Sequence, residues 1–174
     1  MWLSVALLMA ADLASILKSI QDPAAQKALV LLAKGGDLDA RWEAVVLSRR
    51  GQLAGLAPKV ADGWFQAALV ARRPGACLEE ARVRIDKNRD AEDLLRCAAE
   101  GHLAEGQYLL GRLILNRIAA EDEPHRYEGL AWLALAARSG YGPATRRWEM
   151  LARELPLEDL ERVEQTTKQL PLRG

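Results

Sequence analysis

Few side chains in this sequence are of the types that carry catalysis or bind metals. The chain has two cysteines, Cys77 and Cys97, and two histidines, His102 and His125. A protein zinc site usually shows a close ligand pair such as Cys-x-x-Cys, because a short turn pre-positions two ligands. No such pair is present, and no glycine-rich phosphate loop follows a strand pattern. The sequence therefore predicts neither a metal site nor a cofactor.

The two cysteines leave two interpretations open. In a helical hairpin, Cys77 at the start of one helix would lie near Cys97 towards the end of the antiparallel partner. A disulfide is then geometrically feasible in an oxidising compartment. We favour two buried free thiols, because free cysteine is among the most buried residue types.

Neither histidine has an obvious catalytic partner. His102 follows a helix-ending glycine and is interpreted as a turn residue, while His125 lies in the acidic segment 121–126 and is expected to be solvated. Catalysis would need a second positioned group, and the chain has no nucleophile motif to supply one. We therefore expect a protein that is not an enzyme. The alternative is a small-ligand or hydrolytic site in a groove, which would have to use His125, Glu121 and Cys97.

Charge gives no sign of nucleic-acid binding. Lys and Arg number 24, Asp and Glu also number 24, and the formal net charge is zero, so non-specific attraction to a phosphate backbone is not expected. The doublets Arg49-Arg50 and Arg72-Arg73 fall at helix ends, where the helix dipole favours cations. Arg146-Arg147 opens a helix, where cations are disfavoured. That doublet is the better candidate for pairing with an acidic neighbour or partner.

The elements that must position these residues are predicted to be helices. Only 5% of the chain is aromatic, Ala and Leu dominate, and no clear strand pattern is present. Two near-copies of one pattern end in Gly101 and Gly140, which are 140 − 101 = 39 positions apart. That spacing lies in the range of stacked helical pairs. Gly140 is interpreted as the left-handed residue that stops its helix, and Gly101 as a helix-ending glycine.

The stretch 91–144 resembles the Sel-one-like repeat, a relative of the tetratricopeptide repeat. The residues that match that motif are Tyr108, Leu110-Gly111, Glu121-Asp122, Gly129-Leu130-Ala131-Trp132, Ala136-Ala137, Gly140 and Ala144. Small residues such as Gly111 and Ala131 stand where two helices would cross closely, and Trp132 would fill a remaining gap. One departure is Asn116-Arg117-Ile118, where the family usually has glycine after the first helix.

The resemblance covers one full repeat and its flanks, about a third of the chain. It implies an all-α fold, a right-handed solenoid of stacked antiparallel helix pairs with capping helices at both ends. It also implies a scaffold or adaptor function, in which the groove holds a segment of a partner protein whose identity the sequence does not give.

The expected organisation is a single helical-repeat domain over residues 1–174. Residues 1–21 form its N-terminal helix, 22–154 hold degenerate repeats that are clearest at 91–144, and 157–170 form a C-terminal capping helix. Within the repeats, Asp22-Pro23 predicts a helix start. Gln52–Ala61 is interpreted as a linker around Pro58. Asp62 then caps a helix that Pro74-Gly75 stops.

Residues 1–20 are the most ambiguous segment. Met1–Ala11 is free of charge, but no basic residues precede it as in a signal peptide, and it is shorter than a membrane span. A buried first helix is favoured over a cleaved leader or a membrane-associated helix. The expected location is cytoplasmic, with a periplasmic or membrane-associated protein as the alternative if residues 1–20 act as a leader.

A binding face is predicted from helix periodicity. Glu105, Leu109, Arg112 and Asn116 recur at +4, +7 and +11, on one face of a helix. Aligning Ala40 with Ala104 adds the corresponding residues of an earlier helix, Arg41, Val45, Ser48 and Gln52. In a solenoid, equivalent faces of successive helices line a groove. The residues predicted to contact a partner are Arg41, Ser48, Glu105, Leu109, Arg112 and Asn116.

Overall fold

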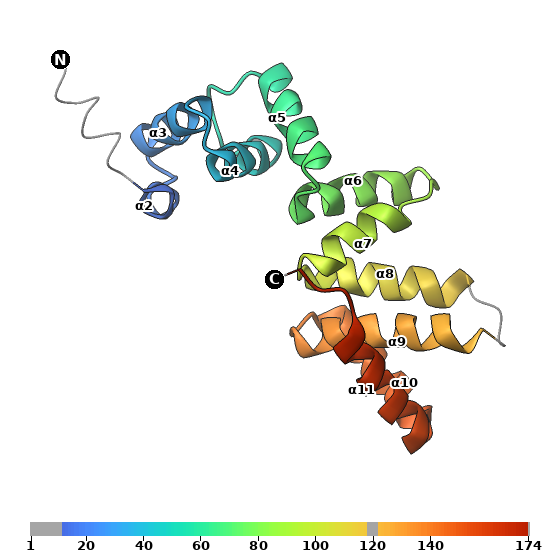
Figure 1. Cartoon of the computed structure of the whole chain (residues 1–174). Helices are drawn as coiled ribbons and strands as arrows, with labels where there is room; N and C mark the ends of the chain where they lie inside the picture. The colour runs from blue at the N-terminus through green and yellow to red at the C-terminus, as the bar shows by residue number, and fades with distance from the viewer. Residues whose placement is uncertain (1–11, 118–121, 174) are drawn as a thin grey trace, which may run out of the picture. The chain divides into compact units, whose positions relative to one another are not determined.

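Helices account for all the regular secondary structure in the described part of the chain. The computed structural model describes residues 12–117 and 122–173, and these form ten α-helices and no strand (Figure 1). The all-helical expectation is confirmed. The chain divides into two units, one ending at Ala71 and one beginning at Arg72.

The first unit contains four of the helices. They are α2 (Leu13–Lys18), α3 (Pro23–Lys34), α4 (Leu38–Arg49) and α5 (Pro58–Val70). Each helix packs on the next in chain order. The core of the unit lies where α3 meets α4, and it includes Leu29, Ala33, Ala40 and Ala44, all without exposed surface.

The second unit contains the other six. They are α6 (Pro74–Asp86), α7 (Glu92–Glu100), α8 (Ala104–Arg117), α9 (Glu123–Arg138), α10 (Gly142–Glu154) and α11 (Leu157–Gln169). Helices α6 to α10 pack in chain order, and α11 returns to pack on α9. Figure 1 shows this succession from green to red. Packing of sequence neighbours is what a helical repeat requires.

Prolines begin helices in both units. Asp22 caps α3 by accepting a hydrogen bond from the Ala24 N–H at 2.8 Å, and Pro23 occupies the first turn, as predicted. Pro58 and Pro74 stand in the same position of α5 and α6. The predictions of a linker around Pro58 and of a cap at Asp62 are therefore wrong, since both residues lie within α5. A helix does end before Pro74, at Val70, and Pro74 begins the next one. Proline fits the first turn because the N–H that it lacks has no partner there.

Five helix ends in the described residues share one geometry, which includes a residue with positive φ: Gly36, Gly51, Asn88, His102 and Gly140. Three of them lie in turns of only three residues. In the α3–α4, α7–α8 and α9–α10 turns, a residue with positive φ follows the helix: Gly36 (108°), His102 (62°) and Gly140 (77°). The N–H of the next residue donates to the carbonyl five positions back, with N···O distances of 3.4, 3.1 and 3.2 Å. This is the Schellman arrangement. The two helices that each turn joins pack against each other.

The left-handed residue of the α7–α8 turn is His102, and Gly101, the predicted helix-ending glycine, is the C-cap of α7. The equivalent residues His102 and Gly140 are 140 − 102 = 38 positions apart. The expectation that His102 is a turn residue is confirmed. Gly101 is needed for a different reason, because a Cβ there would lie 2.1 Å from the Cγ of Pro74.

Helices α8 and α9 cross closely. A Cβ on Gly111 would lie 2.7 Å from the carbonyl oxygen of Gly129, and one on Gly129 would lie 2.8 Å from the Cγ of Leu115. Trp132, one turn after Gly129, is fully buried. The prediction of small residues at a close crossing is confirmed here.

The predicted N-terminal segment is only partly described, because residues 1–11 lie outside the described residues. The remainder includes α2, in which Ile16 is buried in the core of the first unit. None of the helices formed by residues 12–117 and 122–173 has the length and apolar character needed to cross a bilayer.

Candidate protein-binding face

Several side-chain contacts in the second unit join alternate helices, while others, such as Arg117 with Glu92, join neighbouring ones. Between α6 and α8, Arg82 Nε donates to Glu105 Oε1 at 2.9 Å. Between α8 and the start of α10, the rings of Tyr108 and Tyr141 lie with centroids 5.4 Å apart. Arg112 of α8 lies over Tyr108. We call the surface formed by Arg82, Glu105, Tyr108, Arg112 and Tyr141 the tyrosine face.

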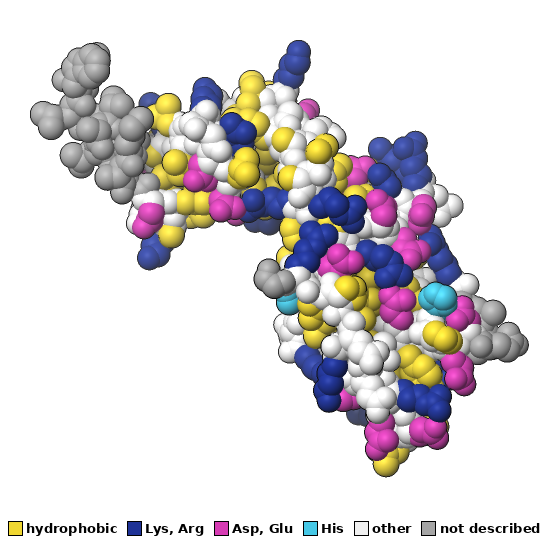
Figure 2. Space-filling view, viewed as in Figure 1, with side chains coloured by type: hydrophobic (Ala, Val, Ile, Leu, Met, Phe, Trp, Pro, Cys, Tyr) yellow, Lys and Arg dark blue, Asp and Glu magenta, His cyan; other side chains and the backbone are white. Residues whose placement is uncertain are grey.

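The odd-numbered helices share a different set of contacts. Arg96 of α7 pairs with Glu128 of α9 at 2.6 Å. Further along, the Tyr127 hydroxyl of α9 donates to Asp159 of α11 at 2.7 Å. We call the surface that carries these contacts the ion-pair face, and its members are Glu92, Arg96, Glu123, Glu128, Asp159, Arg162, Arg138 and Glu164. Figure 2 shows acidic and basic side chains interspersed over this unit.

Charges on the ion-pair face are neutralised within the chain. The hydrogen bond from Arg96 to Glu128 raises the pKa of Arg96, and the second carboxylate, Glu92, adds to the effect. The hydrogen bond from Tyr127 to Asp159 raises the pKa of Tyr127, because a phenol that donates to a carboxylate resists ionisation. Since these groups already have partners, the face offers little charge to a ligand.

A shallow, open hollow of about 240 Å³ lies between α9 and α11 on the ion-pair face. Its charged side chains, Glu123 and Arg162, pair with each other at 3.4 Å. The other residues that line it are Pro124, Tyr127, Gln165, Thr166 and Gln169. No described group of three or more Cys, His, Asp or Glu side chains is placed to hold a metal ion. The hollow has none of the convergent, unpaired titratable groups expected of an active site.

The tyrosine face retains charge that the chain does not neutralise. Arg82 is paired with Glu79 and Glu105. Arg112, by contrast, forms no ion pair among the described residues, and its guanidinium carbon lies 5.4 Å from the Tyr108 ring centroid. Burial raises the pKa of Tyr141, and the nearby Glu105 carboxylate adds to the shift. Two tyrosines and a cation without an ion pair among the described residues are thus presented together.

The predicted residues on α8 fall on or beside this face. Glu105 is on the tyrosine face, where it is the partner of Arg82, and Arg112 is an exposed member of it. Leu109 is half-buried and Asn116 is exposed. The sequence pattern missed Tyr108 and Tyr141 as surface residues, because tyrosines in such a motif are expected to fill the core.

The predicted residues on α4 were aligned in the wrong register. Counting from the left-handed residue of each turn, Ala40 is equivalent to Gly106 and Ala144, four positions on in each case: 40 − 36, 106 − 102 and 144 − 140. It is not equivalent to Ala104. Val45 is 1% exposed and Ser48 is half-buried, so this stripe does not continue the exposed residues of α8.

Arg41 belongs to the turn that precedes it. Its Nε donates to the carbonyl oxygen of Ala33 at 2.9 Å, and the equivalent Gln107 Nε2 donates to Ala99 at 3.2 Å. Thr145 Oγ1 lies 3.5 Å from the Ala137 carbonyl in the third turn. In each turn a polar side chain thus adds a contact to a carbonyl at the end of the helix, which also accepts the backbone N–H of the left-handed residue. Arg41 therefore has a hydrogen-bond partner within its own turn, and its predicted contact with a partner protein stays a prediction.

Cys77 and Cys97 are joined by a disulfide, so the interpretation as free thiols is wrong. The sulfur atoms are 2.10 Å apart, and both side chains are fully buried between α6 and α7. The predicted alternative of a hydrolytic site loses Cys97, since a disulfide sulfur is not a nucleophile. Of its other members, Glu121 lies outside the described residues. His125 is exposed, with Nδ1 2.7 Å from Asp122 Oδ2.

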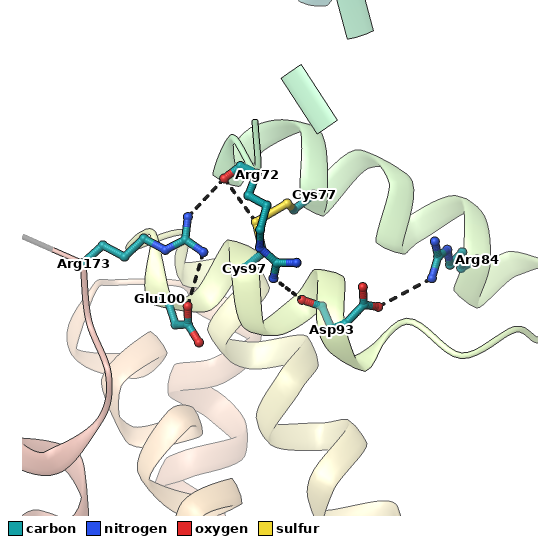
Figure 3. Close-up of a disulfide and its surroundings, with 7 residues drawn as sticks. All are labelled: Arg72, Cys77, Arg84, Asp93, Cys97, Glu100 and Arg173. Carbon is teal, nitrogen blue, oxygen red and sulfur yellow. Dashed lines mark hydrogen bonds and ion pairs between the residues drawn. A yellow bond between two sulfur atoms is a disulfide. The ribbon is translucent and has the colours of Figure 1, made fainter. Parts of the chain in front are cut away.

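The C-terminal segment lies beside this disulfide (Figure 3). Arg173 Nη1 donates to the Arg72 carbonyl at 3.1 Å, and Nη2 pairs with Glu100 at 3.3 Å. That same Arg72 carbonyl oxygen is 3.3 Å from Cys97 Sγ. His102 Nε2 lies 2.7 Å from the Arg173 carbonyl oxygen. The turn histidine is therefore hydrogen-bonded to the segment that follows α11.

No protein-family model matches the sequence, and no curated protein matches it either. What bears on function is therefore the pattern of contacts among the described residues.

Proposed function

We propose that this protein is a non-catalytic interaction module of the Sel-one-like repeat type, which binds a segment of a partner protein on the tyrosine face. The observation that supports this most is the separation of the second unit into two faces. Helices α6, α8 and α10 are joined by contacts of Arg82, Tyr108 and Tyr141. Helices α7, α9 and α11 are joined by contacts of Arg96 and Tyr127. Alternation of this kind is typical of stacked helix pairs, whose equivalent faces bind ligands.

In this proposal the stack is a right-handed solenoid, and α11 is its C-terminal cap. Val163 and Thr167 of α11 are buried, while Glu161 and Lys168 are exposed. A helix with one buried edge and a charged outer surface closes an apolar stack against water. Within the first unit, α2 would be the N-terminal cap.

The contrast between the faces favours recognition on the tyrosine face. The ion-pair face uses its carboxylates and guanidinium groups internally. The tyrosine face presents partly exposed tyrosines and the unpaired cation of Arg112. Tyrosine and arginine are enriched at the centres of protein interfaces, because both combine contact area with hydrogen-bonding capacity.

The disulfide favours folding in an oxidising compartment. Disulfides persist in secreted and periplasmic proteins and are rare in the cytosol. In the proposal the cytoplasmic location expected from the sequence is therefore replaced by an extracytoplasmic one. Cys77 and Cys97 are both buried, so the bond would form during folding, before α6 and α7 close over it.

The proposal is tested by capture of partners from the native host with the full, disulfide-bonded chain as bait. A Tyr108→Ala/Arg112→Ala variant removes the exposed contacts of α8. Glu161→Ala/Lys168→Ala is a matched control that changes two exposed residues of α11. We expect a stoichiometric protein partner with the wild type and the control, and its loss with the α8 variant. Recovery of no stoichiometric partner, or equal recovery by all three baits, would contradict the proposal.

A further inference from the structure

The main chain of the segment that follows α11 is bound by groups from other parts of the second unit. The Arg173 N–H donates to the Glu100 carbonyl oxygen at 2.9 Å, and the Arg173 carbonyl oxygen lies 2.7 Å from His102 Nε2. These partners are 73 and 71 positions away in the sequence. Proteins bind extended peptides in this way, through hydrogen bonds to the main chain of the ligand.

The Arg173 side chain is bound as well. Nη1 donates to the Arg72 carbonyl oxygen at 3.1 Å, and Nη2 pairs with Glu100 Oε2 at 3.3 Å. Figure 3 shows the guanidinium directed towards both groups. A planar guanidinium with several donors suits two acceptors in different directions, one of them charged. We call the group formed by Arg72, Glu100 and His102 the arginine site.

The arginine site is held in place by contacts that do not involve the bound segment. Arg72 Nη2 donates to the Asp93 carbonyl at 3.0 Å, and the Arg72 carbonyl oxygen is 3.3 Å from Cys97 Sγ of the disulfide. The α7–α8 turn packs on the start of α6, where a Cβ on Gly101 would lie 2.1 Å from the Cγ of Pro74. A site fixed in this way loses little entropy when it binds a ligand.

His102 has a backbone conformation that favours glycine. Its φ is 62°, and the equivalent residues of the other two three-residue turns are Gly36 and Gly140. Arg72 also has a positive φ, of 50°. Two of the three described non-glycine residues with positive φ therefore contact Arg173. Disfavoured backbone conformations of this kind cluster at functional sites, where the structure around them holds them in place.

The resident segment is attached mainly through polar contacts. Pro171, Leu172 and Arg173 are all exposed. Leu170, directly before them, packs on the core that includes Val163. Beyond Leu170 the attachment consists of hydrogen bonds and an ion pair, whose net contributions are small because water offers similar partners. Residues 171–173 can therefore be displaced by a competing segment without loss of the core contact.

We infer that the arginine site is a second recognition site, which binds an extended segment of a partner protein through one arginine, and that residues 171–173 occupy it until such a segment displaces them. Glu100 supplies the charge that complements a guanidinium. The resident segment shows the chemistry that fits, an arginine preceded by Pro and Leu. The inference goes beyond the proposed function, because no residue of this site belongs to the tyrosine face.

A second copy of the chain is a less favourable occupant than a foreign segment. Exchange of residues 171–173 between two copies would reproduce the contacts that each copy already makes and would add none. Such a pair would still lose translational and rotational freedom on association. A foreign segment has no such limit, since residues on either side of its arginine can make further contacts.

The test uses Arg173→Ala in the full, oxidised chain, which removes the resident arginine, and follows the amide resonances of residues 100–103 by NMR. The first probe is the peptide Gln-Leu-Pro-Leu-Arg-Gly, and the second has Gln in place of the arginine. We expect the arginine peptide to bind at least about tenfold more tightly than its Gln counterpart. The wild type should bind it at least about fivefold more weakly than Arg173→Ala does, because its own segment competes at a high effective concentration.

Further substitutions in the Arg173→Ala chain locate the site. Glu100→Gln removes the carboxylate, and His102→Asn removes the imidazole while keeping a residue type that tolerates positive φ. Each should weaken the arginine peptide at least about threefold. Glu161→Gln removes the same charge from an exposed position of α11 and should change the affinity by less than about twofold. Far-UV circular dichroism checks that each variant folds.

Hydrogen exchange of the wild type tests whether the resident segment leaves its site. The Arg173 amide should show a protection factor at least about a hundredfold lower than that of Leu95, since surface contacts open locally while a buried helix opens with the whole fold. Leu95 is fully buried, and its N–H donates to the Ala91 carbonyl at 2.9 Å. Equal protection of the two amides would make the segment a fixed part of the fold and overturn the inference.

Four binding results would also overturn it. They are equal or undetectable binding of the two peptides by Arg173→Ala, equal affinity of the wild type and Arg173→Ala for the arginine peptide, and equal effects of Glu100→Gln and Glu161→Gln. The fourth is a wild-type dimer that Arg173→Ala converts to a monomer, because the occupant would then be a second copy. None of these measurements involves the tyrosine face, so the proposed function is tested separately by partner capture.

Discussion

Cys77 of α6 and Cys97 of α7 form a disulfide with their Cα atoms 6.1 Å apart, and neither side chain is exposed. The bond joins the first two helices of the second unit, which also pack against each other. It fixes the α6–α7 hairpin from which the rest of that unit is stacked.

Reduction of this disulfide should destabilise the protein. The bond links residues 20 positions apart, and the loss of that constraint on the unfolded chain is worth about 3 kcal/mol. Urea unfolding with and without reductant measures the difference in free energy of unfolding. A Cys77→Ala/Cys97→Ala variant is the control and should not respond to reductant. Two free thiols in the unfolded, unreduced wild type would contradict the prediction.

Gly111→Ala should separate α8 from α9. Its Cβ would meet the backbone oxygen of Gly129 at 2.7 Å, and backbone cannot move aside as a side-chain end can. The gain in helix propensity, about 1 kcal/mol, is outweighed by overpacking, and we expect a net loss of about 1–2 kcal/mol. Gly142→Ala is the matched control, since its Cβ would meet only the end of Arg146 at 3.7 Å. An equal change in the midpoint of thermal unfolding of the two variants would contradict the close approach of α8 and α9 at Gly111.

Arg41 and Arg112 should separate stability from binding. Arg41→Met removes the hydrogen bond to the Ala33 carbonyl and should lower the free energy of unfolding by about 1 kcal/mol without affecting partner capture. Arg112→Met should weaken partner capture and leave the free energy of unfolding unchanged. Arg112 is exposed and makes no ion pair among the described residues. Arg50→Met, at an exposed C-cap, controls for loss of charge. Partner loss in Arg41→Met with unchanged stability would restore the groove predicted from the sequence.

His125 should titrate above its ordinary range. The hydrogen bond to Asp122, followed by the attraction of that carboxylate, raises the pKa of His125. A raised pKa means that protonation stabilises the fold: the contribution is fully present below the unfolded value of about 6.5 and disappears as pH rises through the folded value. NMR titration of the imidazole measures this. Asp122→Asn should return the pKa towards 6.5, whereas Glu123→Gln should leave it unchanged.

Local features of the fold could be predicted from the sequence because they act over a few residues. Helix propensity, the Asp22 cap and the Gly140 stop each depend on neighbours within one or two turns. Gly111 at a close crossing followed from the same spacing. Proline could not be interpreted in this way. Pro58 and Pro74 look alike whether a helix ends before them or begins at them, so the boundaries of α5 and α6 were misplaced.

The candidate site depended on which side chains the fold already uses. Arg41 and Arg112 are chemically identical in the sequence, yet one satisfies a carbonyl of its own turn and the other lies exposed on a tyrosine. The Cys77–Cys97 bond likewise required two helices to bring their Cβ atoms together. The sequence by itself determined that helices form and where several of them turn, because those preferences are local. Only the tertiary structure decided which polar groups meet across helices, because those partners are distant in sequence and are brought together only by packing.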